Sequence, residues 1–248
     1  MAERVVVITG AGSGIGRSTA IKFASKGDKV VVADFNEKGG QETVDMIKAQ
    51  NGEATFVKVD VSKFDQVESM IEKTVELYGS LDVIFNNAGI GKIIPFLDYT
   101  VEDYDRVIGV NQHGVFYGML AAGRKMRDLN IKGVIINTAS VFGYLSNQYT
   151  FAYQASKGAV RMMCQTGALE LAPYGIRVVG VAPGTVDTPI VQGYKDAGLT
   201  DKLKGNQMRG DLIKPEAIAN AVYLLSLEEA DVINGSVVML DDGYASFK

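Results

Sequence analysis

Short runs of β-branched residues alternate along the chain with longer amphipathic stretches, and this alternation restricts the possible folds more than any other feature. The runs are nearly continuous in Val and Ile, which is typical of strands buried on both faces. The expected strands are 4–9, 29–34, 54–59, 81–86, 133–139, 176–182 and 236–241. The expected helices are about 15–26, 37–50, 64–78, 101–129, 152–172 and 215–226. We therefore predict a parallel sheet with helices on both faces, in one α/β domain.

The composition fits such a domain and disfavours several classes of protein. The 248 residues are 47% hydrophobic and carry a formal net charge of −4, so neither a nucleic-acid nor a membrane partner is expected. The single cysteine, Cys164, rules out an intrachain disulfide and fits a reducing cytoplasm. The single histidine, His113, excludes zinc sites built on several histidines, and no metal site is predicted. No apolar run reaches the roughly 18 residues of a membrane helix, and the first residues do not resemble a signal segment.

A glycine-rich turn follows the first predicted strand and leads directly into a helix. Residues 9–16 read TGAGSGIG, which gives the spacing G-x-x-x-G-x-G. A turn of this kind lets the backbone approach a pyrophosphate, and the helix N-terminus offers free N–H groups. No lysine follows the glycines, so a phosphate-transfer loop is disfavoured. A purely structural turn is the alternative.

An acidic residue, Asp34, ends the second strand eighteen residues after Gly16. Its carboxylate can accept hydrogen bonds from both ribose hydroxyls of an adenosine and would repel a 2′-phosphate. Neither Phe35, which comes next, nor Ser13 in the glycine turn is basic. We therefore predict NAD rather than NADP as cofactor, although Asp34 could also be a simple strand-end acid.

Three further segments follow strand ends, and each has two interpretations. Asp60 and Val61 could contact the adenine edge, or Asp60 could cap the following helix. Asn86 and Asn87 could tie neighbouring strands together or reach a ribose. The backbone after residues 183–184, a Pro-Gly pair, could meet a carboxamide, or the pair could be a plain turn.

Tyr153 and Lys157 are four residues apart and therefore share one face of the expected helix 152–172. A phenol has a reference pKa near 10 and is a poor base at neutral pH. A cation about 4 Å away, at an effective dielectric of about 20, is worth roughly 4 kcal/mol. This corresponds to about three pKa units and would bring Tyr153 near working pH. Tyr244 and Lys248 share the spacing but lie in what we interpret as a polar tail.

Three polar residues could complete a reaction site. Ser140 ends the fifth strand, where its hydroxyl would point into the crevice that binds ligands, or it could cap a turn. Asn111 lies among apolar neighbours in mid-helix, so a kink or a trapped water is expected. His113 could be a general base, but without an orienting carboxylate a packing or surface position is the better interpretation.

Together these residues resemble the short-chain dehydrogenase/reductase family in its compact form. The matching motifs, in order, are TGAGSGIG at 9–16, DV at 60–61, NNAG at 86–89, N at 111, S at 140, YQASK at 153–157 and PGTVDT at 183–188. The resemblance implies a seven-stranded, doubly wound Rossmann fold over residues 1–248 and a nicotinamide cofactor. Two departures are small: Ala139 replaces a common second Ser, and residues 241–243 read Asp-Asp-Gly where Asp-Gly-Gly is usual.

The resemblance also implies a role for each matched residue. Tyr153 would be the acid/base, Lys157 would lower its pKa and hold the nicotinamide ribose, Ser140 would orient the carbonyl, and Asn111 would hold a water in a proton relay. The expected cofactor-binding residues are Gly10, Ser13, Gly14, Ile15, Gly16, Asp34, Phe35, Asp60, Val61, Asn87, Tyr153, Lys157, Val186 and Thr188. Of these, Val186 and Thr188 would meet the carboxamide.

The predicted function is that of an NAD-dependent oxidoreductase that interconverts a secondary alcohol and a ketone by hydride transfer. Ser140, Phe142 and Tyr153 are the expected substrate contacts. The remaining pocket should draw on Val141, Ile94, Val186 and, in a mobile flap at about 185–214 with one or two short helices, Tyr194 and Met208. This apolar set favours a small or medium neutral alcohol, diol or hydroxy-ketone, unless Arg209 or Lys214 contributes a charge.

Three alternatives stay open. A 3-oxoacyl-thioester reductase of the same family is one, and a nucleotide-sugar epimerase or dehydratase is another. A non-catalytic NAD-sensing module is the third, although Ser140, Tyr153 and Lys157 argue against it. The family also commonly forms tetramers, so we expect a homotetramer that pairs the helices 101–129 and 152–172.

Overall fold

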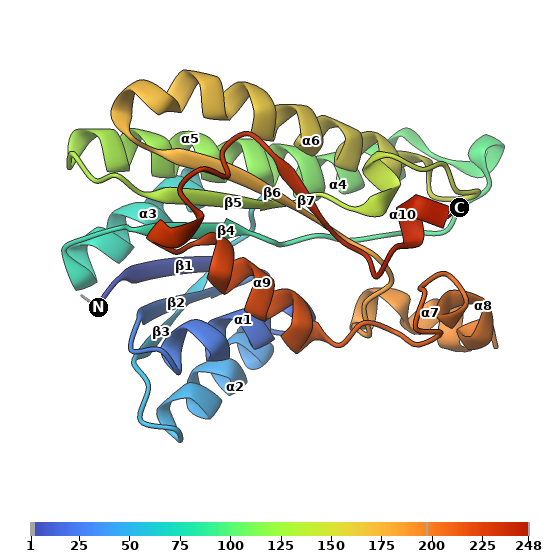
Figure 1. Cartoon of the computed structure of the whole chain (residues 1–248), viewed down its shortest axis with the longest axis horizontal. Helices are drawn as coiled ribbons and strands as arrows, with labels where there is room; N and C mark the ends of the chain where they lie inside the picture. Colours follow the sequence, from blue (N-terminus) through green and yellow to red (C-terminus); the bar gives the residue numbers. More distant parts are fainter. Residues whose placement is uncertain (1–2, 197, 248) are drawn as a thin grey trace.

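The computed structural model describes residues 3–196 and 198–247. Within them, seven strands form one parallel sheet in the order β3-β2-β1-β4-β5-β6-β7 (Figure 1). The strands are β1 (Val5–Thr9), β2 (Lys29–Asp34), β3 (Ala54–Lys58), β4 (Val83–Asn86), β5 (Val134–Thr138), β6 (Arg177–Pro183) and β7 (Val237–Leu240). The predicted doubly wound fold is confirmed. The strand order reverses direction between β1 and β4, where sheets of this kind bind their ligands.

Helices cover both faces of the sheet (Figure 1). One face carries α1 (Gly14–Ala24), α2 (Glu37–Lys48) and α9 (Pro215–Leu225). The other face carries α3 (Phe64–Tyr78), α4 (Val101–Ile108), α5 (Gly114–Asp128) and α6 (Phe151–Leu171). The two layers need two separate cores. In one of these cores, the ring of Phe23 in α1 packs edge to face against the ring of Tyr223 in α9, with 5.2 Å between the ring centroids.

The continuous Val and Ile runs follow from this layering. Neighbouring residues of a strand point to opposite faces, so Val6 and Val30 enter one core, while Val7 and Val31 enter the other. All four side chains are fully buried. Each contributes about 1.5–3 kcal/mol by leaving water, which favours a strand that is apolar on both sides.

The predicted helix 101–129 is interrupted. α4 ends at Ile108, a π-helical segment occupies Gly109–His113, and α5 begins at Gly114. The buried Asn111, at which the sequence predicts a kink or a trapped water, lies within this π-helical turn. Such turns are common at functional sites, because the extra residue per turn re-aims a side chain.

The segment at 185–214 contains two short helices, as predicted: α7 (Gln192–Asp196) and α8 (Thr200–Lys204). Its two ends are joined by a bridge between Val186 and Ile213. The remaining short helices are the 3-10 turns at Phe96–Asp98, Val141–Gly143, Ala172–Tyr174, Pro189–Val191 and Glu228–Ala230, and α10 (Tyr244–Phe247). Both the flap and α10 lie at the carboxyl edge of the sheet (Figure 1). Among the described residues, no helix combines the length and apolar character needed to cross a bilayer.

Candidate active site

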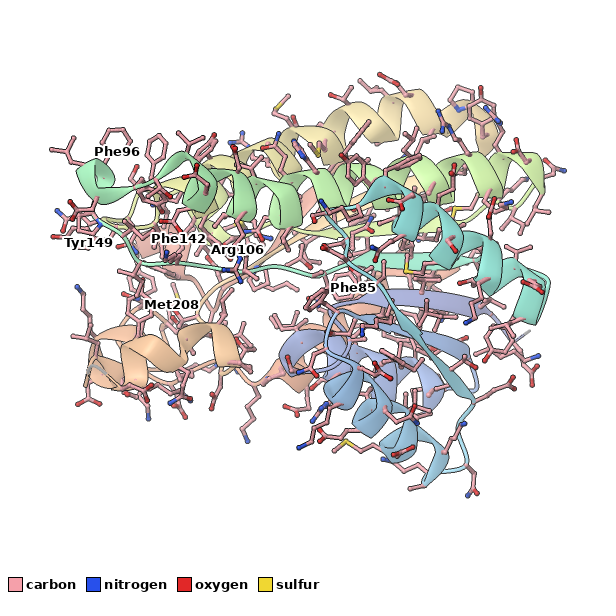
Figure 2. All side chains as sticks on the ribbon, turned by 180° about the vertical axis from the view of Figure 1, so that it is seen from behind. Phe85, Phe96, Arg106, Phe142, Tyr149 and Met208 are labelled. Atoms are coloured by element: carbon pink, nitrogen blue, oxygen red, sulfur yellow. The ribbon has the colours of Figure 1, made fainter. Side chains whose placement is uncertain are left out.

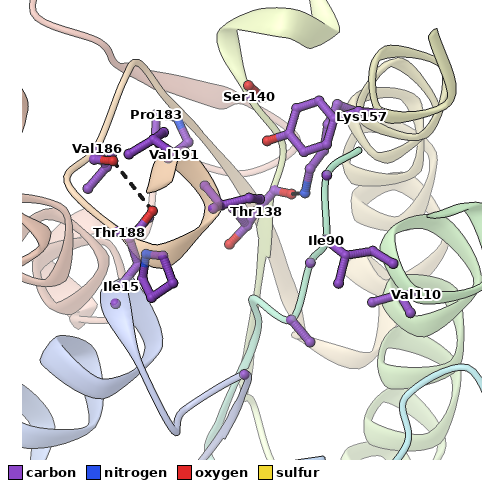
Figure 3. A pocket seen from close by; sticks show the side chains of 18 of the residues that line it. Ile15, Ile90, Val110, Thr138, Ser140, Lys157, Pro183, Val186, Thr188 and Val191 are labelled. Carbon is purple, nitrogen blue, oxygen red and sulfur yellow. Dashed lines mark hydrogen bonds between the residues drawn. The ribbon is translucent and has the colours of Figure 1, made fainter. Parts of the chain in front are cut away.

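A cavity of about 1310 Å³ opens at the carboxyl edge of the sheet, between the glycine turn, the strand ends and the flap. Almost all of the predicted site residues line it. They are Gly10, Ser13, Gly14, Ile15, Asp34, Phe35, Asp60, Val61, Asn87, Ser140, Phe142, Tyr153, Lys157, Val186 and Thr188. Figure 3 shows Ile15, Val186 and Thr188 on one side of the cavity and Ile90 and Val110 on the other. The chain folds segments more than 170 residues apart in sequence around one space.

The glycine turn is tightly packed, and two of its residues need the backbone freedom of glycine. Gly10 and Gly14 have φ values of +65° and +50°, a region that favours glycine, and a Cβ at Gly10 would lie 2.8 Å from the Cα of Ala88. Ser13, the N-cap of α1, makes no side-chain capping bond. The N–H groups of the first helical turn therefore remain free for an anion in the cavity. These features fit a dinucleotide.

Gly16 departs from its predicted role, because it lies behind the turn rather than on the cavity wall. A Cβ there would overlap the carbonyl of Gly10 and would lie 2.8 Å from the amide nitrogen of Asn87. Gly16 is buried, and its task is to let α1 pack closely against the turn.

Asp34 holds the turn from the end of β2. Its Oδ2 accepts a hydrogen bond from the backbone N–H of Gly12 at 2.7 Å, and its Oδ1 accepts one from Asn36 at 2.8 Å. Phe35 beside it is exposed at the rim of the cavity. The carboxylate thus faces the space beside the turn, where the ribose of a dinucleotide would be expected.

Asp60 lines the cavity but does not cap α3, so that alternative is wrong. The N-cap of α3 is Lys63, and the helix begins at Phe64. Asp60 instead accepts hydrogen bonds from the N–H and hydroxyl of Ser62, at 3.0 and 2.7 Å. This local Asx turn satisfies the carboxylate before the helix starts.

The paired amides at the end of β4 have different partners. Asn86 donates from Nδ2 to Oδ1 of Asn137 at 2.8 Å and so ties β4 to β5. Asn87 donates from Nδ2 to the carbonyl of Thr9 at 3.0 Å and lines the cavity. Asn86 is therefore structural, and Asn87 connects the glycine turn to the cavity wall.

Tyr153, Lys157 and Ser140 come together at the other side of the cavity. Lys157 is 2% exposed and donates to the carbonyl of Thr138 at 2.6 Å (Figure 3). Its Nζ lies 5.6 Å from the centroid of the Tyr153 ring. Ser140 both lines the cavity and caps a short turn, since its Oγ accepts the N–H of Phe142 at 3.2 Å.

The electrostatics differ from the simple expectation for this pair. Burial raises the pKa of Tyr153 above its ordinary value, and a hydrogen bond with Ser140 opposes that rise. Burial lowers the pKa of Lys157 to about 8. The spacing of Tyr153 and Lys157 predicted a lowered pKa for Tyr153, an expectation that left out desolvation. In this structure desolvation is the largest influence on the pKa of Tyr153, and the Lys157 ammonium donates its hydrogen bond to the carbonyl of Thr138.

Asn111 is fully buried and does not line the cavity. Its Oδ1 accepts the N–H of Ile90 at 2.8 Å, and its Nδ2 donates to the carbonyl of Ile90 at 2.9 Å and to Ser156 at 3.3 Å. The amide thus anchors Ile90, which lines the cavity, to the π-helical turn and α6. Its relay role stays a prediction. His113 is exposed and lies against Tyr117, as a surface residue would.

The substrate end was predicted only in part. Val141, Phe142, Val186 and Tyr194 line it, whereas Ile94 and Met208 do not. Ile94 is buried, and Met208 is 65% exposed. Arg209 and Lys214 are also outside the lining.

Tyr244 is a site residue that the sequence interpretation missed. It lines the cavity and is only 9% exposed, so it does not belong to a polar tail. Lys248, which follows it with the same spacing as Lys157 follows Tyr153, lies outside the described residues. The available signal was position: Tyr244 follows the carboxyl end of a parallel strand, and all such ends meet at one edge of the sheet.

The fold and the cavity define a doubly wound α/β protein built to hold a dinucleotide beside a tyrosine, lysine and serine cluster. The family model described as enoyl-(acyl carrier protein) reductase matches residues 10–245. A cyclopentanol dehydrogenase of Comamonas sp. is 34% identical over 98% of both chains. A cyclohexanol dehydrogenase of Acinetobacter sp. is 37% identical over 98% of this chain and 96% of its own. The crystal structure of a short-chain type dehydrogenase/reductase from Mycobacterium marinum matches with a TM-score of 0.94, at 33% identity over 97% of this chain and 95% of that one.

The chain belongs to the short-chain dehydrogenase/reductase family and is an oxidoreductase of its compact type.

Proposed function

We propose that the enzyme interconverts a secondary alcohol and a ketone with NAD, with Tyr153 as the acid/base. The observation that carries the proposal is the single cavity that joins the glycine turn and Asp34 to Tyr153, Ser140 and Lys157. Two relatives are dehydrogenases of cyclic secondary alcohols, which supports the same reaction class here. The apolar lining at Phe142 supports a small or medium neutral substrate.

Each residue of the cluster has a task that follows from its chemistry. Ser140 holds the substrate oxygen by a hydrogen bond, and Tyr153 takes the proton of the alcohol or returns it to the ketone. Lys157, with a pKa of about 8, carries a positive charge at neutral pH and stabilises the phenolate while it exists. NAD, when bound, supplies the hydride acceptor. Proton transfer by a positioned group is worth about 10²–10⁴-fold in rate.

The cofactor proposal depends on the glycine turn and Asp34. The turn and the free N–H groups of α1 would hold the pyrophosphate, and Asp34 would accept the ribose hydroxyls. Asn87, Asp60 and Val61 line the same part of the cavity. A 2′-phosphate beside the Asp34 carboxylate would be repelled, which supports NAD over NADP.

We also propose a homotetramer in the cytoplasm, with residues 1–248 acting as one domain. Apolar side chains on the two predicted pairing helices face solvent and support helix pairing: Val101 at 71% exposed, Phe116 at 46%, Met162 at 54% and Leu169 at 79%. The lone Cys164 is buried, as suits a reducing compartment. Mobility of the flap at 185–214 belongs to the same proposal, because substrate must enter beside it.

Replacing Tyr153 by Phe tests the function. The Tyr153→Phe variant should lose about 10²–10⁴-fold in kcat with NAD⁺ and a secondary alcohol, because the ring stays and the proton carrier is removed. NADH binding, followed by fluorescence titration, should stay within about twofold, since the glycine turn is unchanged. Turnover at half the wild-type rate would show that Tyr153 is not the acid/base.

A further inference from the structure

Tyr244 lines the substrate end of the cavity from the C-terminal segment of the chain. This segment contributes neither to the glycine turn nor to the Tyr153 cluster. Tyr244 opens α10, which follows β7 after a turn at residues 241–243, and lines the cavity with only 9% of its surface exposed. Its ring meets that of Phe142 edge to face, with centroids 6.2 Å apart and planes at 81°. Phe142 follows Ser140 by two residues, so the Tyr244 ring lies close to where the substrate oxygen would be held.

The flap supplies a third aromatic ring at the same end. Tyr194 of α7 lines the cavity, and a hydrogen bond joins its phenol to the side chain of Asn147. Tyr194 lies near enough to both Tyr153 and Tyr244 to raise the pKa of each phenol, in addition to their burial. The three rings, from the loop after β5, the flap and the C-terminal segment, therefore surround one space next to Tyr153.

The turn before Tyr244 is fixed firmly enough to act as a wall. Asp241 is 6% exposed, and its two carboxylate oxygens accept the N–H groups of Gly243 at 3.1 Å and Ala245 at 2.7 Å. These bonds hold the first turn of α10 against the end of β7.

A second set of contacts ties this turn to the flap. The carboxylate of Asp242 accepts the N–H of Arg209 at 2.8 Å and pairs with its guanidinium at 3.1 Å. The N–H of Met208 donates to the carbonyl of Asp242 at 2.9 Å. Figure 2 shows Met208 on the flap and Phe142 above it, on the part of the molecule that faces the flap. Asp242 has a φ of +49°, in the left-handed backbone region that favours glycine, and its contacts to the flap hold it in this conformation.

We propose that Tyr244 is a specificity-determining residue that limits the size of the alcohol. The proposal rests on the proposed function and names its substrate class: compact apolar secondary alcohols whose carbon frame packs against the rings of Phe142, Tyr194 and Tyr244. A bulkier frame has to occupy the volume that the Tyr244 ring fills.

The test compares a compact and a bulky alcohol in two variants of Tyr244. For wild type, Tyr244→Ala and Tyr244→Phe, kcat/KM is measured with NAD⁺ and cyclohexanol or a phenyl-substituted cyclohexanol. In Tyr244→Ala the bulky-to-compact ratio of kcat/KM should rise by about tenfold or more, since one missing methylene in a pocket already changes selectivity by about tenfold. Tyr244→Phe keeps the ring and should leave the ratio within about threefold.

The controls separate a local wall from general damage. Tyr174→Ala removes a ring that is 49% exposed and lies outside this cavity, so its ratio should match wild type. Thermal unfolding and NADH titration report folding and cofactor binding for each protein. If Tyr244→Ala does not fold, Tyr244→Leu provides a smaller apolar side chain, and its ratio should rise in the same direction.

The outcomes distinguish the two proposals. Suppose that wild type oxidises cyclohexanol and that Tyr244→Ala or Tyr244→Leu folds. An unchanged bulky-to-compact ratio of kcat/KM then overturns the role of Tyr244 and leaves the proposed function standing. An equal rise in Tyr244→Phe also overturns it, because the hydroxyl rather than the ring would then set selectivity. A wild type that binds NADH but oxidises no secondary alcohol overturns both proposals.

Discussion

The two ends of the cavity are built in different ways. The cofactor end is held by short hydrogen bonds between polar side chains and the backbone: the N–H of Gly12 donates to the Asp34 carboxylate at 2.7 Å, and the side-chain amide of Asn87 donates to the carbonyl of Thr9 at 3.0 Å. The substrate end is built from side chains of three segments far apart in sequence, at Phe142, Tyr194 and Tyr244.

The anchoring contacts differ as well. At the substrate end, the ion pair between Arg209 and Asp242 involves a guanidinium that is 87% exposed, and such pairs are worth about 0–1 kcal/mol. At the cofactor end, Gly16 lies under the turn with no space beside it. The difference shows that the backbone under the glycine turn leaves no room for an added atom, whereas the ion pair that links the flap to the C-terminal turn adds little to stability.

The largest expected effect is a direct contrast between the two ends. Gly16→Ala places a methyl group into the carbonyl of Gly10 and should reduce the free energy of unfolding by about 3 kcal/mol. Gly193→Ala, in the flap, is the matched control, because a Cβ there meets no atom within 4 Å. It should change stability by less than about 0.5 kcal/mol. Urea denaturation of both variants measures this, and equal losses would remove the contrast.

The next effect concerns the charge buried between the two ends. Lys157 has a pKa of about 8 in the folded protein and an ordinary value of 10.5 when unfolded. Between these pH values the unfolded chain binds more protons, so this residue makes stability rise with pH. From pH 8 to pH 10, wild type should gain about 2 kcal/mol relative to Lys157→Met.

Urea denaturation of wild type and Lys157→Met at pH 8 and pH 10 measures this difference in the free energy of unfolding. Cys164, whose pKa burial raises to about 11, contributes with the opposite sign but is present in both proteins. Parallel pH profiles for the two proteins would show that Lys157 does not carry a lowered pKa.

The smallest effect tests where cofactor selectivity resides. Asp34→Asn removes the charge that opposes a 2′-phosphate, so the ratio of kcat/KM for NADP⁺ to that for NAD⁺ should rise about tenfold, or 1.4 kcal/mol. Asp45→Asn, an exposed acid on α2, is the matched control and should leave the ratio unchanged. Steady-state kinetics with both cofactors measures it. A similar rise in Tyr244→Ala would mean that the two ends are not independent.

Local features of the site could be predicted because they depend on neighbours in sequence. The spacing of Tyr153 and Lys157 fixes a shared helix face, and the glycines of the first turn fix its conformation wherever the chain goes. Asp34 was found because it ends a strand. For Asp60 the sequence left two interpretations open, and only the Asx turn with Ser62 shows that the helix begins later and that the cap is the wrong one.

Residues whose role depends on distant segments could not be assigned in this way. The sequence indicates that a buried Asn111 needs hydrogen-bond partners, but it does not say which. Its partners are the backbone of Ile90 and the hydroxyl of Ser156, and they reach Asn111 only because α6 packs beside it. The pKa of Tyr153 needed the burial around it, which no spacing supplies.

The sequence by itself determined the layered sheet, the glycine turn and the Tyr153 face, because periodicity and φ preference act within a few residues. Only the tertiary structure decided that Gly16 supports the turn from behind and that Tyr244 closes the substrate end. Both depend on contacts that exist only after separate segments have packed together and excluded water from between them.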